Sequence, residues 1–248
     1  MEQTAPTNLV PILIGGLLFL AAIIALSMWA SQVRRQRTGS RQEALFALGF
    51  VPLEPPPAEL RDRVAALQPH RSQGQVTLRS VYGRPIEGGQ VYLFESIDAE
   101  SDDVSFLTDG TLAIASKALR SPTFTALPRL EARGSLGLLM EGMLERAYAI
   151  LADRGGLIRV PFPDDPEFEE RFVVLAAEPG AAEAFLTAER RTALLTLPKD
   201  LVVAAHLDTV TLSAYARPGG TVNSEPDVDQ IGTRLELLQK LFQGLVTE

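Results

Sequence analysis

The chain has 248 residues, with 31 acidic and 23 basic side chains and a formal net charge of −8. Apart from one arginine cluster near the N-terminus it has no basic patch of the kind that binds phosphates, so we expect no nucleic-acid partner. The absence of cysteine excludes disulfides, thiolate nucleophiles and Cys-ligated metals. The length allows one sizeable domain or two small ones.

The first predicted element is a membrane-spanning helix at 9–30, LVPILIGGLLFLAAIIALSMWA, a segment without a charged residue. At about 1.5 Å per residue a helix of this length is roughly 33 Å long, enough to cross a bilayer. A secretory signal peptide is the weaker alternative, because the N-terminal region is acidic and the apolar run is too long. Residues 1–8 then form a periplasmic tail.

The orientation follows from the basic linker at 31–40. Basic residues that flank a span stay on the cytosolic side, so the N-terminus lies outside and residues 41–248 form a cytosolic domain. The anchoring and orienting residues are Trp29, Arg34, Arg35 and Arg37. Gly15 and Gly16 are small enough to let a second membrane helix approach closely.

Helical and then β patterns follow in the first half of the cytosolic domain. We predict helices at 41–48 and 58–67, and irregular structure at Pro52 and Pro55 to Pro57. Alternating patterns predict strands at 76–81 and 90–97, a turn-rich segment at 83–89, and a hairpin of 104–107 with 111–116.

The second half begins with a break at Ser121-Pro122, which suggests a sub-division near 121–135. Further predicted elements are helices at 136–153, 181–185 and 188–195, a helix start at Asp164-Asp165 that leads into PEFEERFVVL, and a hairpin of 201–205 with 210–215 around residues 206–208. This order favours an α+β fold of antiparallel strands and several helices, with two similar-sized halves as one possibility.

The C-terminal helix has the clearest amphipathic pattern outside the membrane segment. Its apolar stripe consists of Ile231, Leu235, Leu238, Leu241, Phe242 and Leu245. We expect this stripe to pack on the domain's own core, as amphipathic surface helices usually do. The alternative is an interface with a partner through Leu235, Leu238 and Phe242.

Three phrases along the chain resemble a family of bacterial single-pass membrane-anchored proteins with a cytosolic α+β domain and no assigned activity. The matching residues are Val91, Leu93, Phe94 and Glu95, then Leu127, Pro128, Leu130 and Ala132, and finally Asp165, Pro166, Phe168, Phe172 and Leu175. The chain departs from the family pattern at Arg133-Gly134. The resemblance covers most of 41–246 and implies an architecture, but no chemistry. The span at 9–30 and the arginines that follow it predict a location in the bacterial inner membrane.

Candidate catalytic groups are few. The carboxylates Asp98, Glu100, Asp102 and Asp103 lack the spacing of a calcium loop, and Asp164 and Asp165 are expected to be helix-start surface charges. The two histidines, His70 and His206, are expected in exposed loops; His206 with Asp208 lacks a G-x-S-x-G serine. We therefore predict no catalytic, cofactor-binding or metal-binding residues.

These observations favour an accessory role over an enzymatic one. The first hypothesis is a non-enzymatic subunit that stabilises a larger integral-membrane complex from its cytosolic face, with the lipid bilayer and other membrane subunits as partners. A photosynthetic or respiratory complex is the first expectation, by analogy of topology with the H subunit of photosynthetic reaction centres. The alternative is a free-standing membrane-tethered sensor that binds a ligand or signalling partner, and a carboxylate hydrolase is the least favoured.

Overall fold

The computed structural model describes residues 41–67, 76–97, 110–129, 148, 156–214 and 228–247. The predicted tail, membrane helix and linker at 1–40 lie outside these residues, and with them Gly15, Gly16, Trp29, Arg34, Arg35 and Arg37. No helix within the described ranges has both the length and the apolar character that a bilayer crossing requires. The predicted helix at 41–48 is confirmed as a helix over 41–47, and 49–248 forms a separate compact unit.

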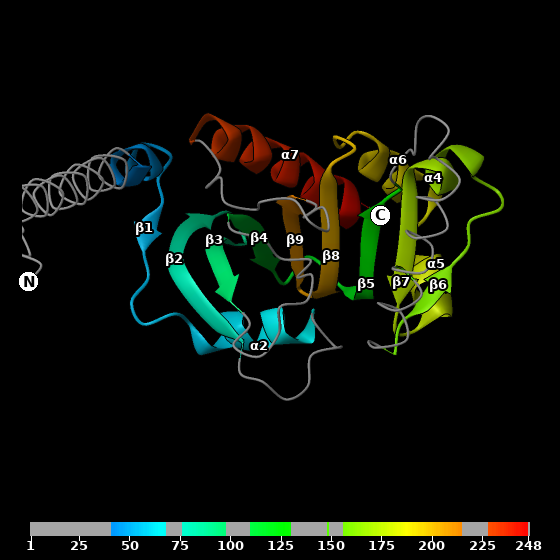
Figure 1. The fold of residues 1–248 in the computed structure, drawn as a ribbon, viewed down its shortest axis with the longest axis horizontal. Coiled ribbons are helices and arrows are strands. Elements are labelled where there is room, and N and C mark those ends of the chain that lie inside the picture. Colours follow the sequence, from blue (N-terminus) through cyan, green and yellow to red (C-terminus); the bar gives the residue numbers. More distant parts are fainter. Residues whose placement is uncertain are drawn as a thin grey trace, which may run out of the picture. The chain divides into compact units, whose positions relative to one another are not determined.

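The strands of this unit form one antiparallel sheet, so the predicted α+β class is confirmed. Its nine strands lie in the order β1-β2-β3-β4-β9-β8-β5-β7-β6, which can be followed from one edge to the other in Figure 1. They are β1 (Val51–Pro52), β2 (Thr77–Ile86), β3 (Gly89–Ile97), β4 (Thr111–Ser116), β5 (Ser121–Pro128), β6 (Ile158–Val160), β7 (Phe172–Ala176), β8 (Leu201–Leu207) and β9 (Thr209–Ala214).

The helices of the unit match most of the predicted ones. They include α2 (Ala58–Ala66), α4 (Pro166–Arg171), α5 (Pro179–Phe185), α6 (Ala188–Leu195) and α7 (Val228–Val246). The segment PEFEERFVVL divides at Phe172, where the helix ends and β7 begins. The aromatic and β-branched residues of this second part favour a pleated, buried strand. Of the predicted helix at 136–153 the structure describes only Tyr148, which is helical and buried.

The central strands are covered on both faces, which explains why every residue of β4 is buried. Leu60 and Val64 of α2 pack with Tyr92, Phe94 and Ala113 on one face. Because side chains alternate along a strand, Leu112 and Ile114 point to the other face, where α7 contacts β4 and β9. In Figure 1, α2 and α7 accordingly lie on opposite sides of these strands.

The predicted break at Ser121-Pro122 is wrong, because these residues begin β5. This strand lies between β8 and β7 in the interior of the sheet, so the sheet includes 121–128. Residues 130–135 of the suggested sub-division near 121–135 lie outside the described residues. A register irregularity between Ser121 and Phe124 accommodates the proline, which has no N–H to donate to the ladder.

Two further predictions about irregular segments are wrong for similar reasons. Pro52 lies in β1, the two-residue strand at the sheet edge, where a missing N–H is tolerated and a short strand limits edge-to-edge pairing. The segment 83–89 belongs mostly to β2, which runs on to Ile86 before a turn at Glu87 and Gly88. Of the predicted hairpin, 111–116 is β4, and 104–107 lies outside the described residues.

The stripe of α7 packs inside the domain. Its buried residues are Ile231, Leu235, Leu238, Leu241 and Leu245, whereas Phe242 is only half-buried. Leu235 and Leu238, two of the three residues considered for a partner interface, are therefore covered by the chain itself.

The two glycines of α7 should respond in opposite directions to alanine. A Cβ at Gly232 would meet nothing within 4 Å, so Gly232→Ala should stabilise the fold by about 0.5–1 kcal/mol through helix propensity. A Cβ at Gly244 would lie 2.6 Å from Ala193 Cβ of α6, so Gly244→Ala should destabilise it by about 1–3 kcal/mol. Chemical denaturation of both variants measures this difference, and equal effects would contradict the close α6–α7 packing.

Candidate functional site

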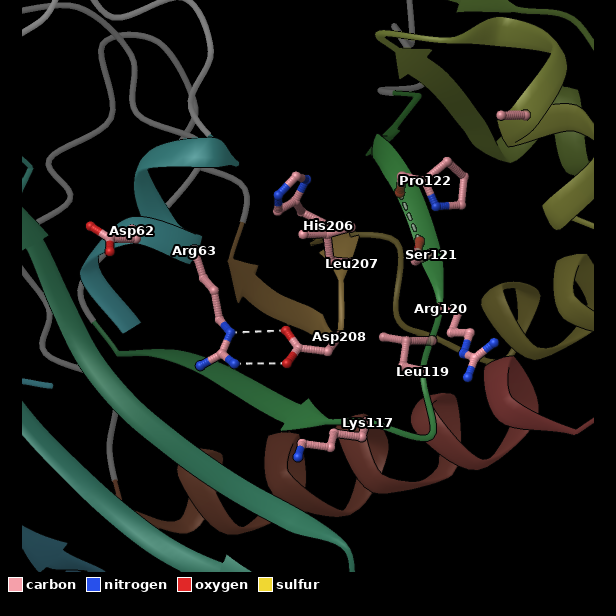
Figure 2. Close-up of a pocket in the computed structure, with 11 residues that line it drawn as sticks. Asp62, Arg63, Lys117, Leu119, Arg120, Ser121, Pro122, His206, Leu207 and Asp208 are labelled. Carbon is pink, nitrogen blue, oxygen red and sulfur yellow. Dashed lines mark hydrogen bonds and ion pairs between the residues drawn. The ribbon is translucent and has the colours of Figure 1, made fainter. Parts of the chain in front are cut away.

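A pocket of about 920 Å³ opens at one end of the sheet. It lies between α2, the β4–β5 connection and the β8–β9 turn, as Figure 2 shows. The lining residues are Asp62 and Arg63 of α2, Lys117, Leu119 and Arg120 of the connection, Ser121 and Pro122 of β5, Ala181 of α5, and His206, Leu207 and Asp208 of the turn.

The β8–β9 hairpin around residues 206–208 is confirmed. His206 pairs with Thr209, which leaves Leu207 and Asp208 as a two-residue loop. Leu207 has φ of 52°, a conformation that suits glycine and that costs a residue with a Cβ about 1–3 kcal/mol. Its side chain is 62% exposed although it is large and apolar. The turn thus holds a strained, exposed leucine in the pocket wall.

Asp208 ties the turn to α2. Arg63 donates from Nε to Oδ1 at 2.8 Å and from Nη2 to Oδ2 at 2.7 Å, the paired geometry of a strong guanidinium–carboxylate contact. The Ser116 N–H also donates to the Asp208 carbonyl at 2.8 Å. Burial by itself would raise the pKa of Asp208, but the hydrogen bonds and charge of Arg63 outweigh it and lower the pKa. Asp208 is therefore an ionised structural partner of Arg63.

His206 is half-buried, which corrects the prediction of an exposed histidine. Its Nδ1 lies 2.7 Å from Thr123 Oγ1. Burial lowers the pKa of His206, and the negative charge of Asp208 offsets only part of this shift. In the described hydrogen bonds Ser121 Oγ donates to the Pro122 carbonyl and Asp208 accepts from Arg63. A Ser–His–Asp relay needs the serine bonded to the histidine and the histidine bonded to the aspartate, and the described hydrogen bonds of Ser121, His206 and Asp208 do not follow this order.

The pKa of His206 predicts an acid-sensitive contribution to stability. Because the folded-state pKa is below the unfolded value of about 6.5, the unfolded chain binds more protons as the pH falls below that value. The contribution is therefore complete above about pH 6.5 and is lost as the pH falls through the folded-state pKa. Chemical denaturation at pH 7.5 and 5.5 should show a smaller loss of stability for His206→Gln than for the unmodified chain. An equal loss would contradict this assignment.

Asp164 and Asp165 form a second cluster, around a buried arginine. Arg191, 7% exposed, donates from Nε to Asp165 Oδ2 and from Nη2 to Asp164 Oδ2, both at 2.8 Å. Its Nη1 donates to the Leu186 carbonyl, and the guanidinium lies 5.1 Å from the centre of the Phe162 ring. Asp165 also caps α4 by accepting from the Phe168 N–H at 3.1 Å. The expected helix start is confirmed at Asp165, and Asp164 is exposed as expected. What the sequence did not show is their shared partner Arg191, through which this cluster holds the start of α4 to α6.

The two aspartates should differ in their effect on stability. Asp165→Ala removes a helix cap and one partner of a buried cation, so we expect a loss of about 2 kcal/mol. The Asp164 side chain is 67% exposed, so Asp164→Ala should cost less than about 1 kcal/mol. Denaturation midpoints of the two variants test the difference, and the reverse order would refute the structural role of Asp165.

The free cations of the pocket are Lys117 and Arg120. Both are exposed, and neither forms an ion pair or hydrogen bond with any residue that the structure describes. In the described part of the chain no three His, Cys, Asp or Glu side chains are grouped as metal ligands would be. His70 and the carboxylates Asp98, Glu100, Asp102 and Asp103 lie outside it. What the pocket offers chemically is positive charge beside apolar surface.

The fold and pocket define an α+β protein with one antiparallel sheet and a cationic pocket at the β8–β9 turn. No model of a known protein family matches the chain, and a search of curated proteins finds no match. Among solved structures, the chain is similar to the mycobacterial trehalose monomycolate transport factor A, TtfA. The identity is 15%, the TM-score is 0.49, and the alignment covers 84% of this chain and 94% of that one.

Proposed function

We propose that the chain is a non-enzymatic, membrane-tethered accessory protein whose folded domain supports a larger membrane complex from the cytosolic side. The observation that supports this proposal most is that the carboxylates considered for catalysis form ion pairs with arginines of the same domain. Asp164 and Asp165 are paired with Arg191, and Asp208 is paired with Arg63. Carboxylates whose oxygens accept hydrogen bonds from arginines in the folded domain are occupied as structural partners, so we assign these groups to the fold and not to acid–base chemistry.

We infer the membrane anchor from the apolar segment 9–30 and the arginines that follow it. A reporter that is active only in the cytosol should work when fused after Glu248, since basic residues stay cytosolic. Replacing Arg34, Arg35 and Arg37 together with Glu should scramble insertion. Activity of a periplasm-only reporter at the same position would refute the proposed orientation in the bacterial inner membrane.

The accessory role is tested by purification in mild detergent followed by mass spectrometry. A subunit should migrate with a large complex, and the co-purified proteins then identify that complex, with photosynthetic or respiratory subunits as the first expectation. As a second arm, alanine at His206 or Asp164 should leave the complex and cellular function intact where the variant accumulates normally. Loss of function at normal abundance and normal complex size would reveal chemistry and overturn the proposal.

The pocket favours a second candidate, a membrane-tethered sensor that binds a small ligand. It combines about 920 Å³ of space with two cations that no described residue neutralises. A sensor should migrate alone or as a small oligomer in the same detergent experiment, which separates it from the accessory role.

A further inference from the structure

The pocket has a charge balance opposite to that of the chain as a whole. Its lining contains the cations Arg63, Lys117 and Arg120 but only two carboxylates, Asp62 and Asp208, whereas the chain has 31 acidic and 23 basic residues. Arg63 and Asp208 neutralise one another through their paired hydrogen bonds. The remaining charged groups of the lining are the cations Lys117 and Arg120 and the acid Asp62, which leaves the pocket with a net positive charge.

Apolar surface lies next to this positive charge. Leu119, Pro122, Ala181 and Leu207 line the same pocket. Among the large apolar residues that the structure describes, Leu207 is the most exposed, at 62%. Covering it with an apolar group would be favourable, because apolar surface is then removed from water.

The walls are held in place before any ligand arrives. Arg63 fixes the turn to α2, Ser116 fixes it to the end of β4, and His206 is joined to Thr123 of β5. A site that needs no rearrangement loses less conformational freedom on binding. The volume of about 920 Å³ is within the range of about 300–1,000 Å³ that is usual for small-molecule sites.

We propose that this pocket binds a small amphiphilic anion, a carboxylate or phosphate with an apolar body. The positive charges of Lys117 and Arg120, whose side chains extend in different directions from the β4–β5 connection (Figure 2), attract the anionic group, and the apolar body covers Leu207 and Pro122. Ligand titration tests this binding, whereas the size of the purified complex tests the accessory role. A failure of one proposal can therefore be distinguished from a failure of the other. The same chemistry occurs in fatty acids released from a membrane and in water-soluble organic acids, and chain length distinguishes these two sources.

His206 supplies the reporter for the titration. The chain has only two histidines, so His70→Gln leaves His206 as the single imidazole signal by nuclear magnetic resonance. The full chain in phosphatidylcholine nanodiscs is titrated with hexanoate, acetate and hexanol. Hexanoate should shift the signal saturably and raise the pKa of His206, because a nearby anion favours the imidazolium. Acetate and hexanol should bind at least about tenfold more weakly, since each lacks one half of the interaction.

The variants test which side chains hold the anion. Lys117→Gln combined with Arg120→Gln should weaken hexanoate binding by about tenfold or more. The matched control, Arg79→Gln with Lys240→Gln, changes two exposed cations outside the pocket and should leave affinity unchanged. Leu207→Asn suits the left-handed backbone, so it should keep or raise the melting temperature while affinity falls.

Three results would overturn the proposal: no saturable shift with hexanoate, equal affinity for hexanoate and hexanol, or equal weakening in the cation variant and its control. Dodecanoate decides the source. Affinity that rises steeply with chain length indicates a lipid-derived acid, and equal affinity indicates a water-soluble one.

Discussion

Leu238→Ala should lower the free energy of unfolding by about 2–5 kcal/mol. Leu238 has no exposed surface, and α7 packs on β4, β9 and α6. Truncation therefore leaves a cavity between a helix and a sheet whose hydrogen bonds keep it from collapsing onto the gap. For a domain with a typical stability of about 5–15 kcal/mol this is a large share of the total.

Leu237→Ala is the matched control, because it makes the same change one position earlier in α7 at a half-buried site. Chemical denaturation of the full chain in neutral detergent, followed by circular dichroism, should give a clearly smaller loss for Leu237→Ala. An unchanged denaturation midpoint for Leu238→Ala would refute the assignment of Leu238 to the core and would favour the alternative that the α7 stripe contacts a partner.

The elements that could be predicted from sequence are those whose pattern is local. The stripe of α7 records which face of the helix is buried. The predicted strands at 90–97 and 210–215 agree closely with β3 and β9. The predictions at Pro52 and Pro122 are wrong because proline excludes a strand only where its N–H is needed. An edge position or a register shift removes that need, and neither is visible in one sequence.

The pocket could not be predicted because its residues are distant in sequence. Arg63 and Asp208 are 145 positions apart, and only the strand order brings α2, the β4–β5 connection and the β8–β9 turn together. The sequence places His206 in the correct hairpin, but its hydrogen-bond partner Thr123 belongs to another strand and is 83 positions away. Likewise the partner of Asp164 and Asp165 is an arginine in α6, 27 and 26 positions away.

Gly89→Ala should destabilise the domain by about 3 kcal/mol, at the upper end of the range for overpacking. A Cβ at Gly89 would lie 2.3 Å from the Ala115 carbonyl oxygen and 2.9 Å from Ser116 Cβ. The carbonyl is backbone of β4, which pairs with β3 on one side and β9 on the other, so it cannot move without disturbing the ladder. Neighbouring Gly88 has φ of 73°, but a Cβ there would meet only Ser116 Oγ at 3.9 Å, an ordinary contact distance. Gly88→Ala should therefore cost only about 1 kcal/mol of backbone strain.

The clash that Gly89→Ala introduces should also change the structure of the pocket wall. Ser116 pairs with Gly89 across the β3–β4 ladder and donates its N–H to the Asp208 carbonyl. Displacing Ser116 therefore loosens the turn that holds Leu207 and Asp208, and the His206 signal should shift in Gly89→Ala. Chemical denaturation of Gly88→Ala and Gly89→Ala tests the expected difference in stability, and the His206 resonance of the two variants tests the expected change at the turn. A loss in Gly88→Ala as large as that in Gly89→Ala would contradict the close approach of β3 to β4, and an unchanged His206 signal in Gly89→Ala would contradict its connection to the turn.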